Sequence, residues 1–274
     1  MCVKVIDFCP FIKEKEKSVL KIGIMHPYFF PYLGYWQLMN AVDRYVIYDD
    51  VNYIKGGRVN RNTILTNGEA HNINLPLIGA SPNKHINEVQ VNNNPLLQQK
   101  LIKTLEMCYK KAPYYNDIIS LLSEIMSQET DNLAEYLIFQ IKKIADYLKM
   151  STEFIISSKM DKDSSLKAHD KVIHICKLLG ASEYYNSITG VPLYEPHRDM
   201  FEAAGIELCF PKMREVSYKQ YKNDFVPNLS IIDVMMFNSR EECIRLLSEF
   251  DFVGKEERAS ILNEKGLLQE VSND

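Results

Sequence analysis

The sequence predicts an α/β protein whose core is a mostly parallel sheet, and three observations lead to that fold class. Hydrophobic residues make up 46% of the chain and charged residues 25%, which is ordinary globular usage. The pattern of the N-terminal part predicts a strand, a helix and a second strand within about 30 residues, which is the size of a βαβ unit. The same alternation returns after a helical stretch in the middle. A chain of 274 residues can hold one large domain or two small ones.

The βαβ start places polar residues at the ends of two strands. Residues 21–25 form a short apolar run that predicts the first strand, and residues 33–42 offer a helical apolar side. Residues 45–48 predict a second buried strand. Because carboxyl ends of parallel strands meet at one edge of a sheet, we expect His26 and the pair Asp49-Asp50 to share one crevice.

Other patterns predict the remaining elements. Asn67-Gly68 between two alternating runs predicts a β-hairpin near 63–76. Apolar residues repeat every three or four positions over 95–150, which indicates a helical insert, and Asp131 is the expected cap of its third helix. The α/β alternation then predicts strands at 154–156, 183–186 and 206–210, helices at 170–179, 198–204, 229–237 and 240–250, and a C-cap at Gly180.

These patterns divide the chain into three parts. Residues 1–20 are expected to be an N-terminal extension, because the first strand signal begins only at residue 21. Residues 21–250 form the α/β domain with its helical insert. Residues 251–274 are charged and are expected to be a loose C-terminal tail.

Composition and charge exclude several classes of protein. The chain has 32 Lys and Arg against 36 Asp and Glu, a net charge of −4, so no overall basic field attracts nucleic acid. Its six cysteines include no C-x-x-C pair, which predicts reduced thiols, no intrachain disulfide and a cytoplasmic protein. The charged run 13–17 interrupts any signal peptide, and no apolar run approaches the ~18 residues of a membrane span.

The first unusual motif is the aromatic and proline-rich segment 26–35. It includes His26, Tyr28 and Tyr35, and Gly34 allows close backbone approach at the start of the expected helix. This loop predicts a site for an anionic ligand. An alternative interpretation is that the rings only plug the edge of the sheet.

The second motif, residues 49–62, combines carboxylates, cations and amides around a Gly-Gly turn. Cations and amides in so short a stretch after a buried strand suit a phosphate or carboxylate ligand. The alternative is an ordinary solvated loop. The candidate residues of this motif are Asp49, Asp50, Lys55, Arg58, Asn60, Arg61 and Asn62.

Further candidates lie in the second half of the chain. Ser187, Gly190 and Tyr194 follow a short strand, where hydroxyl and backbone N–H groups can face a ligand, although a connecting turn explains them equally well. Asn228 and Asp233 are candidate substrate contacts. Their alternative roles are structural, with Asn228 capping a helix and Asp233 bonded to a neighbour.

Together these segments resemble the WbqC-like family of bacterial proteins. The matching pieces are residues 25–35, 49–51, 60–62, 173–180 and 225–233, so the resemblance covers nearly the whole chain except its ends. The long aromatic motif is the most specific of them. One position departs from the family, which usually has Gln before the first proline, where this chain has His26.

The resemblance implies a transferase of surface-polysaccharide or amino-sugar biosynthesis. We expect it to move a small acyl or aminoacyl group onto a nucleotide-activated amino sugar, with ATP and Mg²⁺ as candidate cofactors. The loop cations would hold phosphate or carboxylate, and Asp49 or Asp50 would ligate Mg²⁺ or deprotonate an amine. His26 would donate a hydrogen bond or act as a base.

Two function classes compete with this expectation. A non-catalytic protein that carries a sugar nucleotide would bind its ligand without turnover. A tRNA or nucleic-acid binder would use Lys55, Arg58 and Arg61 together with exposed aromatic rings, but the net charge of −4 counts against it. The leading expectation is a small-molecule enzyme that needs no membrane, and the sequence leaves the oligomeric state open.

Overall fold

Five parallel strands form the central sheet, and the computed structural model describes the chain over residues 19–222 and 224–267. The strand order is β7-β2-β1-β8-β9, and every neighbouring pair is parallel. The predicted parallel sheet and the adjacency of the first two strands are therefore confirmed. The strands are β1 (Lys21–Met25), β2 (Arg44–Ile47), β7 (Glu153–Ile156), β8 (Glu183–Tyr185) and β9 (Glu207–Cys209).

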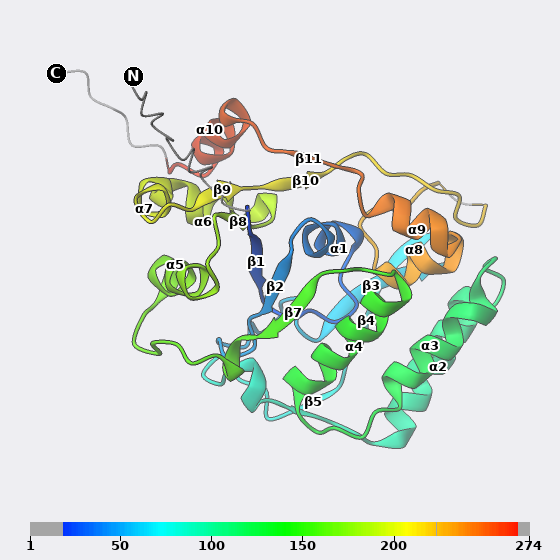
Figure 1. Ribbon diagram of the computed structural model, residues 1–274. Coiled ribbons are helices and arrows are strands. Elements are labelled where there is room, and N and C mark those ends of the chain that lie inside the picture. Colours follow the sequence, from blue (N-terminus) through cyan, green and yellow to red (C-terminus); the bar gives the residue numbers. More distant parts are fainter. Residues whose placement is uncertain (1–18, 223, 268–274) are drawn as a thin grey trace, which may run out of the picture.

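Helices cover both faces of this sheet (Figure 1). One face carries α1 (Leu33–Asn40), α4 (Leu133–Tyr147), α8 (Ile231–Phe237) and α9 (Arg240–Leu246), and the other carries α5 (Ala168–Leu179), α6 (Val191–Tyr194) and α7 (Arg198–Ala203). Side chains of β2 alternate between these layers, because Tyr45 belongs to one buried cluster and Val46 to the other. Gly180 ends α5 in the left-handed conformation, with φ of 72°, as predicted.

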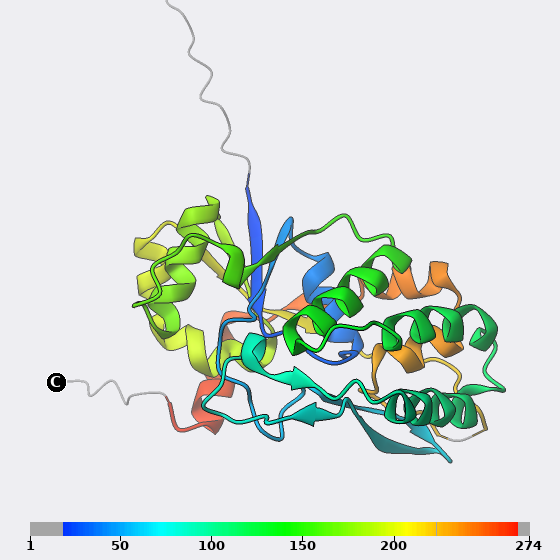
Figure 2. The same ribbon diagram turned by 90° about the horizontal axis from the view of Figure 1, so that it is seen from below.

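The long connection between β2 and β7 contains the predicted hairpin and helical insert. β3 (Arg61–Thr66) pairs with β4 (Glu69–Asn74), and Asn67 and Gly68 at the turn have φ values of 52° and 84°. Figure 2 shows this hairpin running beside α2. The other elements are β5 (Leu77–Ile78), η1 (Ile86–Glu88), β6 (Gln90–Val91), α2 (Pro95–Tyr109) and α3 (Tyr115–Met126).

Two predicted helix caps were wrong by one or two residues. Asn132, not Asp131, caps α4, because its side chain accepts a hydrogen bond from the Glu135 N–H. Ser230, not Asn228, caps α8, because its hydroxyl accepts from the Ile232 N–H. Side chains one or two positions apart were equally suitable caps by type, and backbone register decided between them.

The segment expected as a C-terminal tail is folded in part. β11 (Phe250–Phe252) pairs with β10 (Pro211–Met213), and α10 (Lys255–Glu264) follows it. Arg258 on α10 donates to the Glu195 carboxylate at 2.8 Å, which anchors the helix to η4 (Glu195–His197). The sequence did not reveal α10 because the helix buries little apolar surface, with Leu262 its one buried residue. Residues 1–18 and 268–274 lie outside the described residues, as does most of the predicted extension.

The described part of the chain has two features that bear on the predictions from composition. None of its helices is both long and apolar enough to cross a membrane. The cysteines within it, Cys108, Cys176, Cys209 and Cys243, are free, while Cys2 and Cys9 fall outside the described residues.

Candidate functional site

The order of the strands indicates that a ligand would bind at the carboxyl ends of the parallel strands, which we call the carboxyl edge of the sheet. From β1 the chain continues to β2 and β7 on one side, and then returns to β8 on the other side of β1. The loops after β1 and β8 therefore leave in opposite directions. Open α/β sheets bind their ligands outside the carboxyl ends of the strands at such a switch point. His26, Tyr48, Ser157 and Asn186 are the residues that directly follow β1, β2, β7 and β8.

The loop after β1 is held in place by two buried amides. Asn62 Nδ2 donates to the carbonyl oxygens of Phe29 at 3.0 Å and Phe30 at 2.7 Å. Gln140, on α4, donates to the Tyr28 carbonyl and accepts from the Phe30 N–H, both at 3.1 Å. The Phe29 and Phe30 rings are fully buried and belong to the hydrophobic core. Asn62, predicted to contact substrate, donates its amide to the loop that carries His26 and Tyr28 and so holds that loop in place.

His26 lies half-buried among aromatic rings at this edge. Its ring is parallel to that of Tyr28 at a centroid distance of 6.3 Å, and the Tyr48 ring lies 6.1 Å away. Burial lowers the pKa of His26 below its ordinary value of 6.5, so the imidazole is neutral at pH 7. The buried Tyr35 donates its hydroxyl to the His26 carbonyl at 2.5 Å. Tyr35 thus positions His26 from within the core.

The two neighbouring aspartates have different surroundings. The Asp49 side chain is 2% exposed and accepts two hydrogen bonds from Ser158, from its N–H at 2.9 Å and its hydroxyl at 2.6 Å. Ser158 belongs to η2 (Ser157–Lys159), directly after β7. Asp49 therefore ties the end of β2 to the end of β7. This arrangement favours Asp50 over Asp49 as the carboxylate that meets a ligand.

Asp50 lies between two lysines that the sequence did not single out. One carboxylate oxygen, Oδ2, is 3.0 Å from Lys162 Nζ and 3.4 Å from Lys171 Nζ. Burial opposes the charge of Asp50, but Ser157 and the two ammonium groups outweigh it and hold the pKa of the carboxyl below 3.8. Lys162 also donates to the Ser157 carbonyl.

Lys171 connects this ion cluster to the aromatic rings. Its Nζ atom lies 5.1 Å from the centroid of the Tyr48 ring, a cation–π contact. Burial raises the pKa of Tyr48, and the nearby Asp50 carboxylate adds to that effect. One signal could have revealed Lys171, because it precedes the buried Ile175 by four residues and so lies beside the apolar stripe of α5. Lys162, between two aspartates, gave no such signal.

The predicted cations of the 55–61 loop lie at the surface. Lys55, Arg58 and Arg61 are all exposed. Arg61 donates to the carbonyls of Gly56 and Gly57, and Arg58 makes a long contact of 3.5 Å with Asn62. The Phe29 N–H donates to the Arg58 carbonyl at 3.2 Å, so the backbone of this loop does run beside the aromatic loop.

Asn60 is engaged within its own loop region. Its side chain accepts from the Tyr53 hydroxyl at 2.8 Å and donates to the Leu75 carbonyl at 3.0 Å. Both contacts hold the chain at the start of β3. The side chains of Asn60 and Asn62 therefore both form hydrogen bonds within the protein.

The loop after β8 brings hydroxyl groups to the same edge. Ser187 is nearly buried, and its hydroxyl contacts that of Thr189 at 2.7 Å. Gly190, the last residue of η3 (Ile188–Gly190), has no room for a side chain, because a Cβ there would lie 2.3 Å from Asn186 Oδ1. Tyr194 packs edge-on against Tyr184, with centroids 5.3 Å apart, and contributes to the raised pKa of Tyr48, which places it near that ring.

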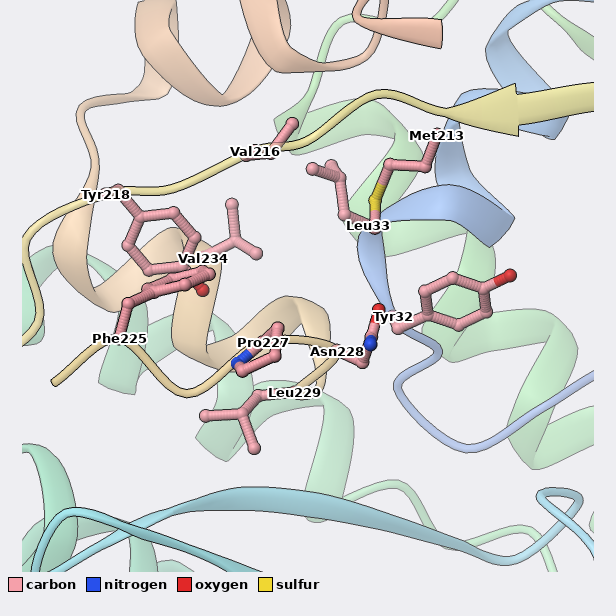
Figure 3. Close-up of a pocket in the computed structure, with 10 residues that line it drawn as sticks. All are labelled: Tyr32, Leu33, Met213, Val216, Tyr218, Phe225, Pro227, Asn228, Leu229 and Val234. Carbon is pink, nitrogen blue, oxygen red and sulfur yellow. The ribbon is translucent and has the colours of Figure 1, made fainter. Parts of the chain in front are cut away.

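Asn228 and Asp233 lie apart from these residues. Asn228 lines a small cavity of about 30 Å³ at the start of α1, shown in Figure 3 with Tyr32 and Phe225. That volume holds one or two water molecules, far below the 300–1,000 Å³ of a ligand pocket. Asp233 is fully buried and accepts from Tyr109 at 2.9 Å, Tyr218 at 2.7 Å and Gln220 at 2.8 Å. The structural role expected as the alternative for Asp233 fits these contacts.

A larger cavity lies between the β3–β4 hairpin and α2. It measures about 660 Å³, and its lining includes His71, Met107, Lys110 and Lys222. None of the predicted site residues is in that lining.

The donor set at the carboxyl edge does not fit a divalent cation well. In the part of the chain that the structure describes, no three His, Cys, Asp or Glu side chains gather as metal ligands. Asp50 is already shared by two ammonium groups, which repel a dication, and both oxygens of Asp49 accept hydrogen bonds.

Comparisons with known proteins agree with the resemblance found in the sequence. A family model described as the WbqC-like protein family matches residues 26–244. The chain belongs to this family. It is also 26% identical over 221 residues to the uncharacterized protein Rv1507c of Mycobacterium tuberculosis. This match covers 80% of the present chain and 93% of the mycobacterial protein. No solved structure matches the chain.

The matched region of the WbqC-like family contains all the elements that surround the candidate site except β1. It begins at His26 and includes the aromatic loop, the Asp49-Asp50 pair, Lys162, Lys171 and the loop after β8.

Proposed function

We propose that this WbqC-like protein is a transferase that moves a small acyl or aminoacyl group onto a nucleotide-activated amino sugar. The resemblance to companions of surface-polysaccharide and amino-sugar pathways supports the substrate class. The observation that supports catalysis is a neutral histidine at the switch point of an α/β sheet, beside an ion cluster of one carboxylate and two ammonium groups.

Acyl transfer to an amine needs a base of suitable pKa near the nitrogen. The amine nitrogen attacks the acyl carbon, the new N–C bond forms, the bond to the leaving group breaks, and the base accepts the proton that nitrogen loses. His26 meets this requirement because burial keeps its imidazole unprotonated at neutral pH. Asp50 is a poorer base, since its pKa is held below 3.8.

The test is turnover with a panel of nucleotide-activated amino sugars and activated acyl or aminoacyl donors. A general base contributes about 10²–10⁴-fold to a rate, so we expect His26→Gln to lower kcat by that order. In the wild type, kcat should fall as the pH drops through the lowered pKa of His26, and this dependence should vanish in His26→Gln. The matched control is His71→Gln, an exposed histidine on β4.

Two results would contradict the proposal. Full activity in His26→Gln would remove the base from the mechanism. Tight binding of a sugar nucleotide without turnover of any donor would identify a carrier protein instead of an enzyme.

A further inference from the structure

We propose that Lys162 and Lys171 form the binding site for a phosphoryl group of the substrate, with Asp50 as the counter-ion that holds both lysines in place. This assignment deepens the proposed function, on which it rests for the source of the phosphate. It replaces the exposed cations of the 55–61 loop as the anion site. It also gives Asp50 a positioning role instead of that of base or metal ligand.

The first argument is charge balance in a partly dehydrated place. The side chains of Lys162 and Lys171 are 6% and 12% exposed, and that of Asp50 is 18% exposed. Both ammonium groups form their ion pair with the one Asp50 carboxylate, so among these three side chains one positive charge has no carboxylate of its own. A charge removed from water is unfavourable unless it is paired, so the cluster is complete only when a second anion joins it.

The second argument is that the two lysines reach Asp50 from separate elements. Lys162 follows η2, which comes directly after β7, whereas Lys171 lies in the first turn of α5. Asp50 follows β2. One ammonium group from a loop and one from the first turn of a helix therefore converge on the carboxylate of Asp50. Converging cations in low dielectric form stronger charge-assisted hydrogen bonds to phosphate than exposed ones do.

The third argument is the position of the cluster relative to His26. Lys171 Nζ lies over the Tyr48 ring, and the same ring lies 6.1 Å from the His26 ring. An anion bound at Lys171 is therefore separated from His26 by a single aromatic side chain. In a sugar nucleotide the phosphate is likewise attached close to the sugar that carries the amine. Phosphate at the lysines and amine at His26 is the arrangement that such a substrate requires.

Inorganic pyrophosphate is the probe, because it presents phosphoryl groups without any base or sugar. Its affinity is measured by isothermal titration calorimetry for the full chain at fixed ionic strength. We expect Lys162→Met and Lys171→Met each to weaken binding at least tenfold, which corresponds to about 1.4 kcal/mol. Lys159→Met is the matched control, since Lys159 is an exposed lysine of η2, and it should bind as the wild type does.

Asp50→Asn gives a test with the opposite sign. The amide oxygen can still accept hydrogen bonds from the two ammonium groups and so keep them in place, but the anion that competes for the lysines is gone. Pyrophosphate should therefore bind several-fold more tightly. The melting temperature of each variant is recorded with and without pyrophosphate. Where a methionine variant does not fold, the arginine variant at the same position keeps the charge and should retain binding.

Several results would overturn the assignment. One is an unchanged affinity for pyrophosphate in folded Lys162→Met and Lys171→Met. Another is an equal loss of affinity in Lys159→Met. The third is weaker binding of pyrophosphate by folded Asp50→Asn. Turnover separates this assignment from the proposed function. Pyrophosphate binding that depends on the lysines without any transferase activity would sustain the assignment alone, whereas activity that survives both lysine variants would sustain only the transferase.

Discussion

Ser158 donates both its N–H and its hydroxyl to the two carboxylate oxygens of Asp49, at 2.9 Å and 2.6 Å. These bonds join the ends of β2 and β7 just below the candidate site. We expect Asp49→Ala to lower the free energy of unfolding by about 3 kcal/mol, because it removes two charge-assisted hydrogen bonds to a buried carboxylate. Asp49→Asn, which can still accept from the N–H, should lose less. Urea unfolding measures both, and equal stability of all three proteins would contradict the expectation.

The amide of Asn62 should matter for stability more than for binding. Asn62→Ala leaves the buried Phe29 carbonyl without its donor and removes one of the two donors to the Phe30 carbonyl, which keeps the Ser230 hydroxyl at 2.8 Å. We therefore expect a loss of about 1–3 kcal/mol. Asn62→Asp should be worse than alanine, since a carboxylate oxygen replaces the NH₂ group that faces those carbonyls. The control is Asn83→Ala at an exposed position. A higher free energy of unfolding for Asn62→Asp than for Asn62→Ala would contradict this account.

The buried Asp233 predicts a particular dependence of stability on pH. Burial raises its pKa in the folded protein above the ordinary value of 3.8. Above pH 3.8 the unfolded chain therefore holds fewer protons at this group than the folded protein does. The free energy of unfolding that Asp233 contributes must fall as the pH rises from about 3.8 through the raised pKa.

Asp233→Asn isolates this contribution, because the amide does not titrate. The free energy of unfolding of the variant, minus that of the wild type, should therefore increase as the pH rises through that window. Urea unfolding at a series of pH values measures the difference between the two proteins. Parallel pH profiles would show that Asp233 titrates alike in the folded and unfolded states.

Gly190→Ala should disturb the loop after β8. The added methyl group would lie 2.3 Å from Asn186 Oδ1, and the Asn186 amide also donates to the Tyr184 hydroxyl at 2.6 Å. Overpacking of this kind typically destabilises by about 1–3 kcal/mol. Gly254→Ala is the control, because no atom lies within 4 Å of a Cβ there and its φ is −71°. A melting temperature of Gly190→Ala equal to that of the control would show that Asn186 has room to move.

The fold was predictable where the signals were local. Apolar runs of strand length, the Asn67-Gly68 turn and the C-cap Gly180 each act within a few residues, and the structure confirms all three. The helix α10 was missed because a mostly polar helix held by Arg258 and Glu195 has no apolar stripe to detect.

The candidate site was predictable only in part, since it depends on pairing between distant strands. The sequence placed His26 and Asp50 at neighbouring strand ends, which the parallel β1–β2 pair confirms. It gave no means to see that Lys171 would approach Asp50 across 121 residues. It also could not show that the 55–61 cations lie at the surface, because residue type alone does not tell whether a charge lies in solvent or against a carboxylate.

The position of β1 has a practical consequence for work with fragments. The family match begins at His26, one residue after the strand that lies in the middle of the sheet between β2 and β8. A fragment trimmed to residues 26–244 would lack that central strand, together with β11 and α10. Its β2 and β8 would present unpaired backbone edges, which are templates for self-association. Recombinant versions that begin before Lys21 and extend beyond α10 should therefore stay dispersed where the trimmed one precipitates.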